Sequence, residues 1–161
     1  MQVLIAPLAA LPFWAIVPFW VVGGVMAFWF AVMMRAPKRD EWTWVIALAL
    51  SPVMIINIGL AQNGGYSALM FIAGFLILDR RPMLAGLLFG LLTVKPQIGL
   101  LIPFELIILG AWRAFWTAAV VTIVLFLASI LLFGTGPWHG FLTETLRVQA
   151  MYLDDPYGPV S

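Results

Sequence analysis

A single lysine-proline pair, Lys95-Pro96, interrupts the long apolar stretch between the cations Arg81 and Arg113. The 12 residues of Met83–Val94 would reach only about 18 Å as a helix, whereas the hydrocarbon core of a bilayer is about 30 Å thick. Pro96 removes a backbone donor and disfavours helical conformation at the residue before it. We therefore expect two half-helices, 83–94 and 97–111, that meet at a turn.

The turn at Lys95 predicts a polar cavity in the membrane. Non-helical backbone at membrane depth is tolerated only where it is buried in protein or lines a wet cavity, and an intramembrane lysine is a functional-site candidate. We interpret Lys95 as a ligand for the phosphate of a lipid, with Gln97 of the same turn as a second substrate-binding residue. The alternative is a lysine that extends from a helix end to the interface.

The composition indicates that the apolar stretches are membrane segments. The 161 residues are 64% hydrophobic and 9% charged, with a mean hydropathy of +1.08, whereas a soluble domain is about 25% charged. The chain lacks cysteine and has one histidine, so thiolate and histidine-cluster metal sites are excluded, and we expect no cofactor. No basic stripe of the kind that tracks nucleic-acid phosphates is present.

The pattern predicts an all-α, polytopic membrane protein with about four full transmembrane helices and one half-membrane hairpin. We expect a transmembrane domain over 1–134 and an extracytoplasmic segment over 135–161, with an amphipathic helix at Trp138–Tyr152. Gly86-x-x-x-Gly90 forms a small-residue ridge that lets helices approach closely. The full spans are expected at 12–34, Trp42–Ala61, Tyr66–Leu78 and Ala114–Phe133.

The positions of Lys and Arg predict the orientation. If loops 35–41, 79–82 and 112–114 are cytoplasmic, they hold six of the eight basic residues. The N-terminus, the Lys95 turn and the C-terminal segment then face the extracytoplasmic side, which for a bacterial inner membrane is the periplasm.

Other polar residues on that side are weaker site candidates. Gln62 and Asn63 can hydrogen-bond a sugar or a phosphate, but Asn63 can equally cap the following helix. Arg147 can meet a lipid phosphate, although a solvated arginine is the commoner outcome. His139 is a candidate acid or base at neutral pH, and its alternative is an interfacial loop residue. We expect a structural role for Glu105 within the second half-helix.

An ordered set of short motifs resembles glycosyltransferase family 87, the polyprenol-phosphate-mannose-dependent mannosyltransferases of the GT-C superfamily. The similarity covers most of the chain. The motifs are Pro52…Asn57…Ala61-Gln62-Asn63, Asp79-Arg80-Arg81-Pro82, Ala85-Gly86-x-x-x-Gly90, Thr93-Val94-Lys95-Pro96-Gln97, Ala111-Trp112-Arg113 and Trp138…Phe141.

The resemblance implies a partial GT-C fold and transfer of a mannosyl or other hexosyl unit from a polyprenyl-phosphate-sugar donor on the extracytoplasmic side. Membrane lipids are then partners as well. In such enzymes the catalytic base is usually an acidic residue of the first outer loop, and the first acidic residues here, Asp40 and Glu41, fall on the predicted cytoplasmic side. We therefore expect the chain to be a fragment that is inactive by itself. The alternatives are a lipid-handling or transporter-like module and an inactive truncated membrane protein.

Overall fold

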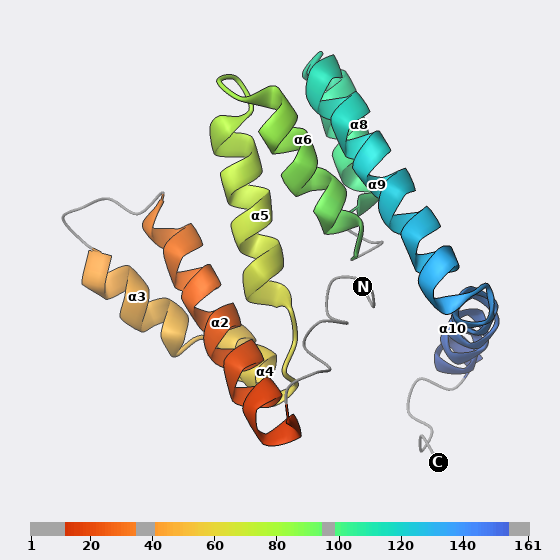
Figure 1. Cartoon of the computed structure of the whole chain (residues 1–161). Helices are drawn as coiled ribbons and strands as arrows, with labels where there is room; N and C mark the ends of the chain where they lie inside the picture. The colour runs from red at the N-terminus through yellow and green to blue at the C-terminus, as the bar shows by residue number, and fades with distance from the viewer. Residues whose placement is uncertain (1–11, 35–40, 95–98, 155–161) are drawn as a thin grey trace. The chain divides into compact units, whose positions relative to one another are not determined.

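The computed structural model describes residues 12–34, 41–94 and 99–154, and all secondary structure within them is helical (Figure 1). The predicted all-α class is therefore confirmed. The chain divides into two compact units, Met1–Val124 and Leu125–Ser161. The elements are α2 (Phe13–Met33), α3 (Glu41–Ala49), α4 (Pro52–Gly59), α5 (Gly64–Ile77), α6 (Pro82–Leu91), the 3-10 helix η3 (Leu92–Val94), α8 (Leu101–Ile108), α9 (Trp112–Phe133) and α10 (Gly136–Asp154).

Two of the described helices are long and apolar enough to cross a membrane. They are Trp14–Met33 within α2 and Trp112–Phe133, which is α9, with mean hydropathies of 2.1 and 2.5. Both coincide with spans expected from the sequence. Helices α5 and α6 are also apolar, but with 14 and 10 residues they are shorter than these two helices.

The segment 42–61 differs from the single span predicted for it. α3 ends at Ala49, and a new helix, α4, starts at Pro52. Ser51 is extended, with ψ of 141°, and its Oγ accepts a hydrogen bond of 3.3 Å from the backbone N–H of Met54. A serine N-cap followed by proline at the first helical position starts a helix rather than continuing one. The Ser51-Pro52 step thus breaks the helix that we expected to run through Trp42–Ala61.

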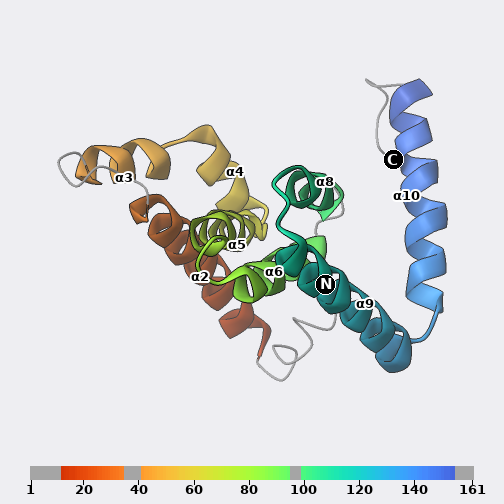
Figure 2. The ribbon, with the colours of Figure 1, turned by 90° about the horizontal axis from the view of Figure 1, so that it is seen from above.

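α5 packs against α2 on one side and α6 on the other (Figures 1 and 2). Gly65 of α5 lies directly against the backbone carbonyl of Gly24 in α2, and no side chain would fit between them. The absence of a side chain at Gly65 is what permits this contact.

The core of the first unit lies where α6, α8 and α9 meet the end of α5. The residues with almost no exposed surface are Ala85, Phe89, Leu92, Ile102, Leu106 and Ala114. Phe89 fills the space beside Gly74 of α5, where a methyl group would contact its ring at 2.5 Å. The small residues on α5 and α6 therefore make room for one large aromatic side chain.

The glycine ridge of α6, at which the sequence predicted a close helix contact without naming the partner, packs against α9. Gly86 lies against the backbone of Ala114, and a methyl group added at Gly90 would lie 2.6 Å from Cβ of Val121. Close approach of two helices through such a ridge gains van der Waals packing. The ridge brings α6 and α9 together along two turns.

The predicted half-helices are present on both sides of residues 95–98. The first half is α6 continued by η3 to Val94, in agreement with the expected 83–94. The second half is α8, which is shorter than the expected 97–111 because Gly110, with φ of +65°, follows its C-terminal end. The turn itself, with Lys95 and Gln97, lies outside the described residues.

Candidate functional site

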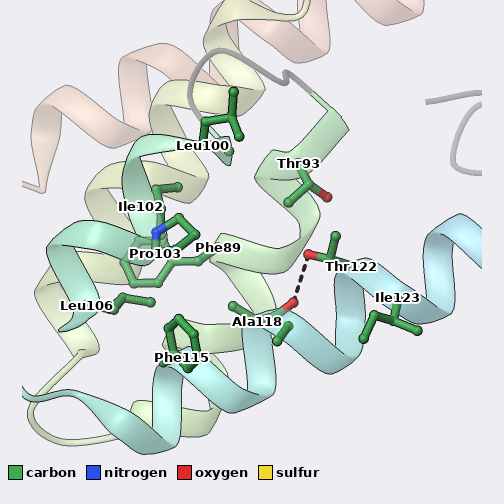
Figure 3. Close-up of a pocket in the computed structure, with 12 residues that line it drawn as sticks. Phe89, Thr93, Leu100, Ile102, Pro103, Leu106, Phe115, Ala118, Thr122 and Ile123 are labelled. Carbon is green, nitrogen blue, oxygen red and sulfur yellow. Dashed lines mark hydrogen bonds between the residues drawn. The ribbon is translucent and has the colours of Figure 1, made fainter.

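An apolar pocket of about 470 Å³ opens between α6, α8 and α9 (Figure 3). Its wall on α6 is Phe89, whose ring is 1% exposed. Pro103 and Leu106 come from α8, and Phe115 and Ala119 come from α9. The remaining lining residues are Thr93, Gly99, Leu100, Ile102, Ala118, Thr122 and Ile123.

Two threonines are the polar side chains that line the pocket. The Thr93 hydroxyl donates a hydrogen bond of 2.6 Å to the Gly90 carbonyl, and the Thr122 hydroxyl donates one of 2.8 Å to the Ala118 carbonyl. Each hydroxyl has one hydrogen, so both donors are already used within their own helices. None of the described residues that line the pocket is charged, and this part of the pocket is suited to hydrocarbon rather than to a sugar.

The predicted phosphate ligand Lys95 follows the pocket directly along the chain. Residues 95–98 lie outside the described residues, but Thr93 and Gly99 on either side of them both line the pocket. A methyl group at Gly99 would lie 3.0 Å from Cα of Thr93, so the two ends of this segment are in contact. The described residues on either side of the segment that carries Lys95 and Gln97 therefore both lie at the pocket.

The Gln62-Asn63 turn lies at a different place in the same unit. Gln62 is exposed and, with Asn57 of α4, lines a small crevice between α2, α4 and α5. Asn63 occupies the N-cap position of α5, but its side chain makes no capping hydrogen bond. Neither residue lines the apolar pocket.

Three further candidates are placed on helices with exposed side chains. Glu105 lies on α8, on a face that does not line the pocket, whereas its neighbour Leu106 does. His139 and Arg147 lie on α10 in the second unit. No group of three or more His, Cys, Asp or Glu within the described ranges could hold a metal ion.

Sequence reasoning missed the contribution of α9 to the pocket. Phe115, Ala119 and Thr122 lie on a helix that is apolar on every side, so no periodic pattern marks the face that lines a cavity. The glycine ridge at Gly86 and Gly90 could have indicated this contribution. The ridge predicts that another helix packs closely against α6, and that helix, α9, lines the pocket.

The model of glycosyltransferase family 87 matches residues 1–157. No curated protein and no solved structure matches the chain.

Proposed function

Because the chain belongs to glycosyltransferase family 87, we propose that it forms part of a membrane enzyme that transfers a mannosyl unit from a polyprenyl-phosphate donor. The acceptor is glycosylated on the extracytoplasmic side of a bacterial inner membrane. The observation that carries this proposal is the pocket between α6, α8 and α9, which is lined by hydrocarbon and ends at the segment that bears Lys95.

The pocket would receive the isoprenoid units nearest the phosphate. Lipid tails are as apolar as the pocket wall, so burial of hydrocarbon gives little net affinity within a bilayer. Selection of the isoprenoid over other lipid chains would then depend on shape. The rigid rings of Phe89, Pro103 and Phe115 give the pocket a fixed shape that would fit a methyl-branched chain.

Lys95 would supply the affinity that hydrocarbon contacts cannot. An ammonium group in a partly dehydrated site attracts a phosphate more strongly than it would in water. During transfer, the same charge would stabilise the lipid phosphate as it leaves the sugar carbon. Gln97 would donate hydrogen bonds to phosphate or sugar oxygens at the same turn.

The remaining candidates would act around the sugar. Gln62 and Asn63 would bind its hydroxyls.

A binding comparison tests the proposal. Variants Lys95→Met and Lys95→Arg of the active enzyme would be compared for affinity towards polyprenyl phosphate. We expect about a tenfold or greater loss for Lys95→Met and partial retention for Lys95→Arg, since one tenfold step corresponds to about 1.4 kcal/mol. Unchanged affinity in Lys95→Met would overturn the phosphate assignment.

A lipid-handling module is the second candidate function, because no charged group occurs among the described residues that line the pocket. It predicts that the protein binds the lipid but transfers no sugar. Transfer of label from the donor to an acceptor by that protein separates the two.

A further inference from the structure

A short connection joins the membrane span α9 to α10 and limits how α10 can be oriented against the end of α9. α9 ends at Phe133, and Gly134 has φ of +73°, which is a conformation that glycine adopts without strain. The Gly134 N–H still donates to the Ile130 carbonyl, and α10 starts only two residues later, at Gly136. The 19-residue helix α10 therefore begins where the apolar span ends.

Trp138 folds back onto the last turns of α9. Its indole N–H donates a hydrogen bond of 3.2 Å to the Ser129 hydroxyl, and its ring lies 4.8 Å from the ring of Phe126 in an edge-on arrangement. All three residues belong to the second unit. The side of α10 that carries Trp138 is thus the side turned towards α9.

The same side of α10 carries exposed apolar residues. At about 100° per residue, Phe141, Leu142 and Val148 all fall within about 80° of the direction of Trp138. Their side chains are 50%, 58% and 45% exposed. Such a face on a helix has no stable place in water unless something apolar covers it.

The opposite side of α10 is mainly polar, with Met151 as an exposed apolar exception about 140° from Trp138. Arg147 lies about 180° from Trp138, and Thr143 and His139 lie about 140° and 100° from it. These three side chains are exposed and belong to one ridge, because each is four residues from the next. α10 is therefore amphipathic, with its apolar side turned towards the membrane span and its polar side turned away.

We infer that α10 lies in the plane of the bilayer interface where α9 leaves the membrane, and that Phe141, Leu142 and Val148 insert among the lipids. An interfacial helix of this kind buries its apolar face about 5–10 Å into the boundary between headgroups and acyl chains. Trp138 sets the rotation of the helix through its contacts with Ser129 and Phe126. Its amphipathic ring suits the headgroup level.

Lipid is favoured over a protein partner as the occupant because the apolar face continues the surface of α9. Leu131 and Leu132, at the end of that span, are 85% and 67% exposed. A bilayer that surrounds the span reaches the underside of α10 without a gap. Arg147 is the one lysine or arginine of α10 and lies on the far side, so attachment does not depend on anionic lipids.

Single-cysteine spin labels in the whole chain test this inference, since the sequence has no native cysteine. The variants Leu142→Cys and Thr143→Cys form a matched pair at adjacent positions about 100° apart around the helix, one on the apolar side and one on the polar side. Arg147→Cys and Phe141→Cys form a second pair. The chain would be placed in vesicles of phosphatidylcholine, and collisions with oxygen, which concentrates in lipid, would be compared with collisions with a water-soluble nickel chelate.

We expect labels at 141 and 142 to be reached mainly by oxygen and labels at 143 and 147 mainly by nickel, with a difference of about tenfold in the ratio. Adding anionic lipid or 0.5 M salt should leave the pattern unchanged, because about 0.5 M salt screens charges beyond roughly 4 Å. Equal access of nickel to 142 and 143 would mean that α10 projects into water and would overturn the inference. Labels at 141 and 142 that neither reagent reaches would overturn it too, since protein would then cover the face. The outcome does not depend on transferase activity.

Discussion

The indole N–H of Trp20 donates a hydrogen bond of 3.1 Å to the carbonyl oxygen of Ala61, which joins α2 to the turn before α5. Ala61 has φ of +47°, which is uncommon for a residue with a side chain and costs about 1–3 kcal/mol. Tyr66 completes the contact, because its hydroxyl donates to the Trp20 carbonyl over 3.1 Å and the two rings lie 4.8 Å apart. Two aromatic residues thus hold the strained turn that presents Gln62.

Replacing Trp20 with phenylalanine should loosen this turn. Trp20→Phe removes the donor to Ala61 and keeps most of the ring, so we expect a loss of about 1 kcal/mol in stability. Trp14→Phe, on the same helix at a side chain that is 78% exposed, is the matched control and should change little. The measurement is the unfolding midpoint in detergent, and equal midpoints for both variants would argue against the role of this hydrogen bond.

The glycine ridge of α6 gives a second prediction. In Gly86→Ala the added methyl group meets the backbone of Ala114, and backbone cannot move aside as a side chain can. We expect destabilisation of about 1–3 kcal/mol from overpacking and a wider separation of α6 from α9. In Gly59→Ala nothing lies within 4 Å of the added group, and the same substitution should be neutral or stabilising by up to about 1 kcal/mol. Similar behaviour of the two variants would contradict the packing described for α6.

Filling the apolar pocket should reduce lipid binding. Ala119→Phe places a ring in the space between α8 and α9, and we expect about a tenfold loss of affinity for polyprenyl phosphate. Val120→Phe adds a ring at the next residue of α9, where the side chain is 57% exposed and does not line the pocket. Titration of both variants with polyprenyl phosphate in nanodiscs measures the difference. Equal affinity would place the lipid elsewhere.

The predicted orientation can be tested by labelling single cysteines with a reagent that does not cross the membrane. Lys38→Cys should react from the cytoplasmic side and Thr143→Cys from the opposite side, because six of the eight basic residues belong to the loops assigned to the cytoplasm. Labelling of both from one side would show that the orientation is wrong.

The sequence predicts the helices of this chain better than their partners. Proline placed the end of the first half-helix correctly, because Pro96 constrains the residue before it whatever surrounds it. The glycine ridge of α6 was visible because its spacing alone predicts a close contact. The break at Ser51-Pro52 was underestimated because a proline inside a membrane helix usually kinks it. The serine that caps the new helix decided the outcome here.

The pocket and the Trp20–Ala61 contact were not predictable in the same way. In a soluble helix the buried face stands out from a polar one, but α9 is apolar on all sides, so Phe115 and Val120 have similar hydrophobicity although one lines the pocket and the other faces outward. The bond from Trp20 to Ala61 joins residues 41 positions apart, and no local pattern marks it.

Photocrosslinking tests the central claim that the pocket between α6, α8 and α9 holds the isoprenoid chain of the donor while Lys95 binds its phosphate. The probe is polyprenyl-phosphate mannose with a diazirine in the isoprene units next to the phosphate, added to the chain in nanodiscs. The adducts would be mapped by mass spectrometry. We predict adducts at pocket residues such as Phe89, Pro103 and Phe115, competition by unlabelled polyprenyl phosphate, and about a tenfold lower yield in Lys95→Met. Adducts spread over the outward face of α9, without competition and with equal yield in Lys95→Met, would contradict the account.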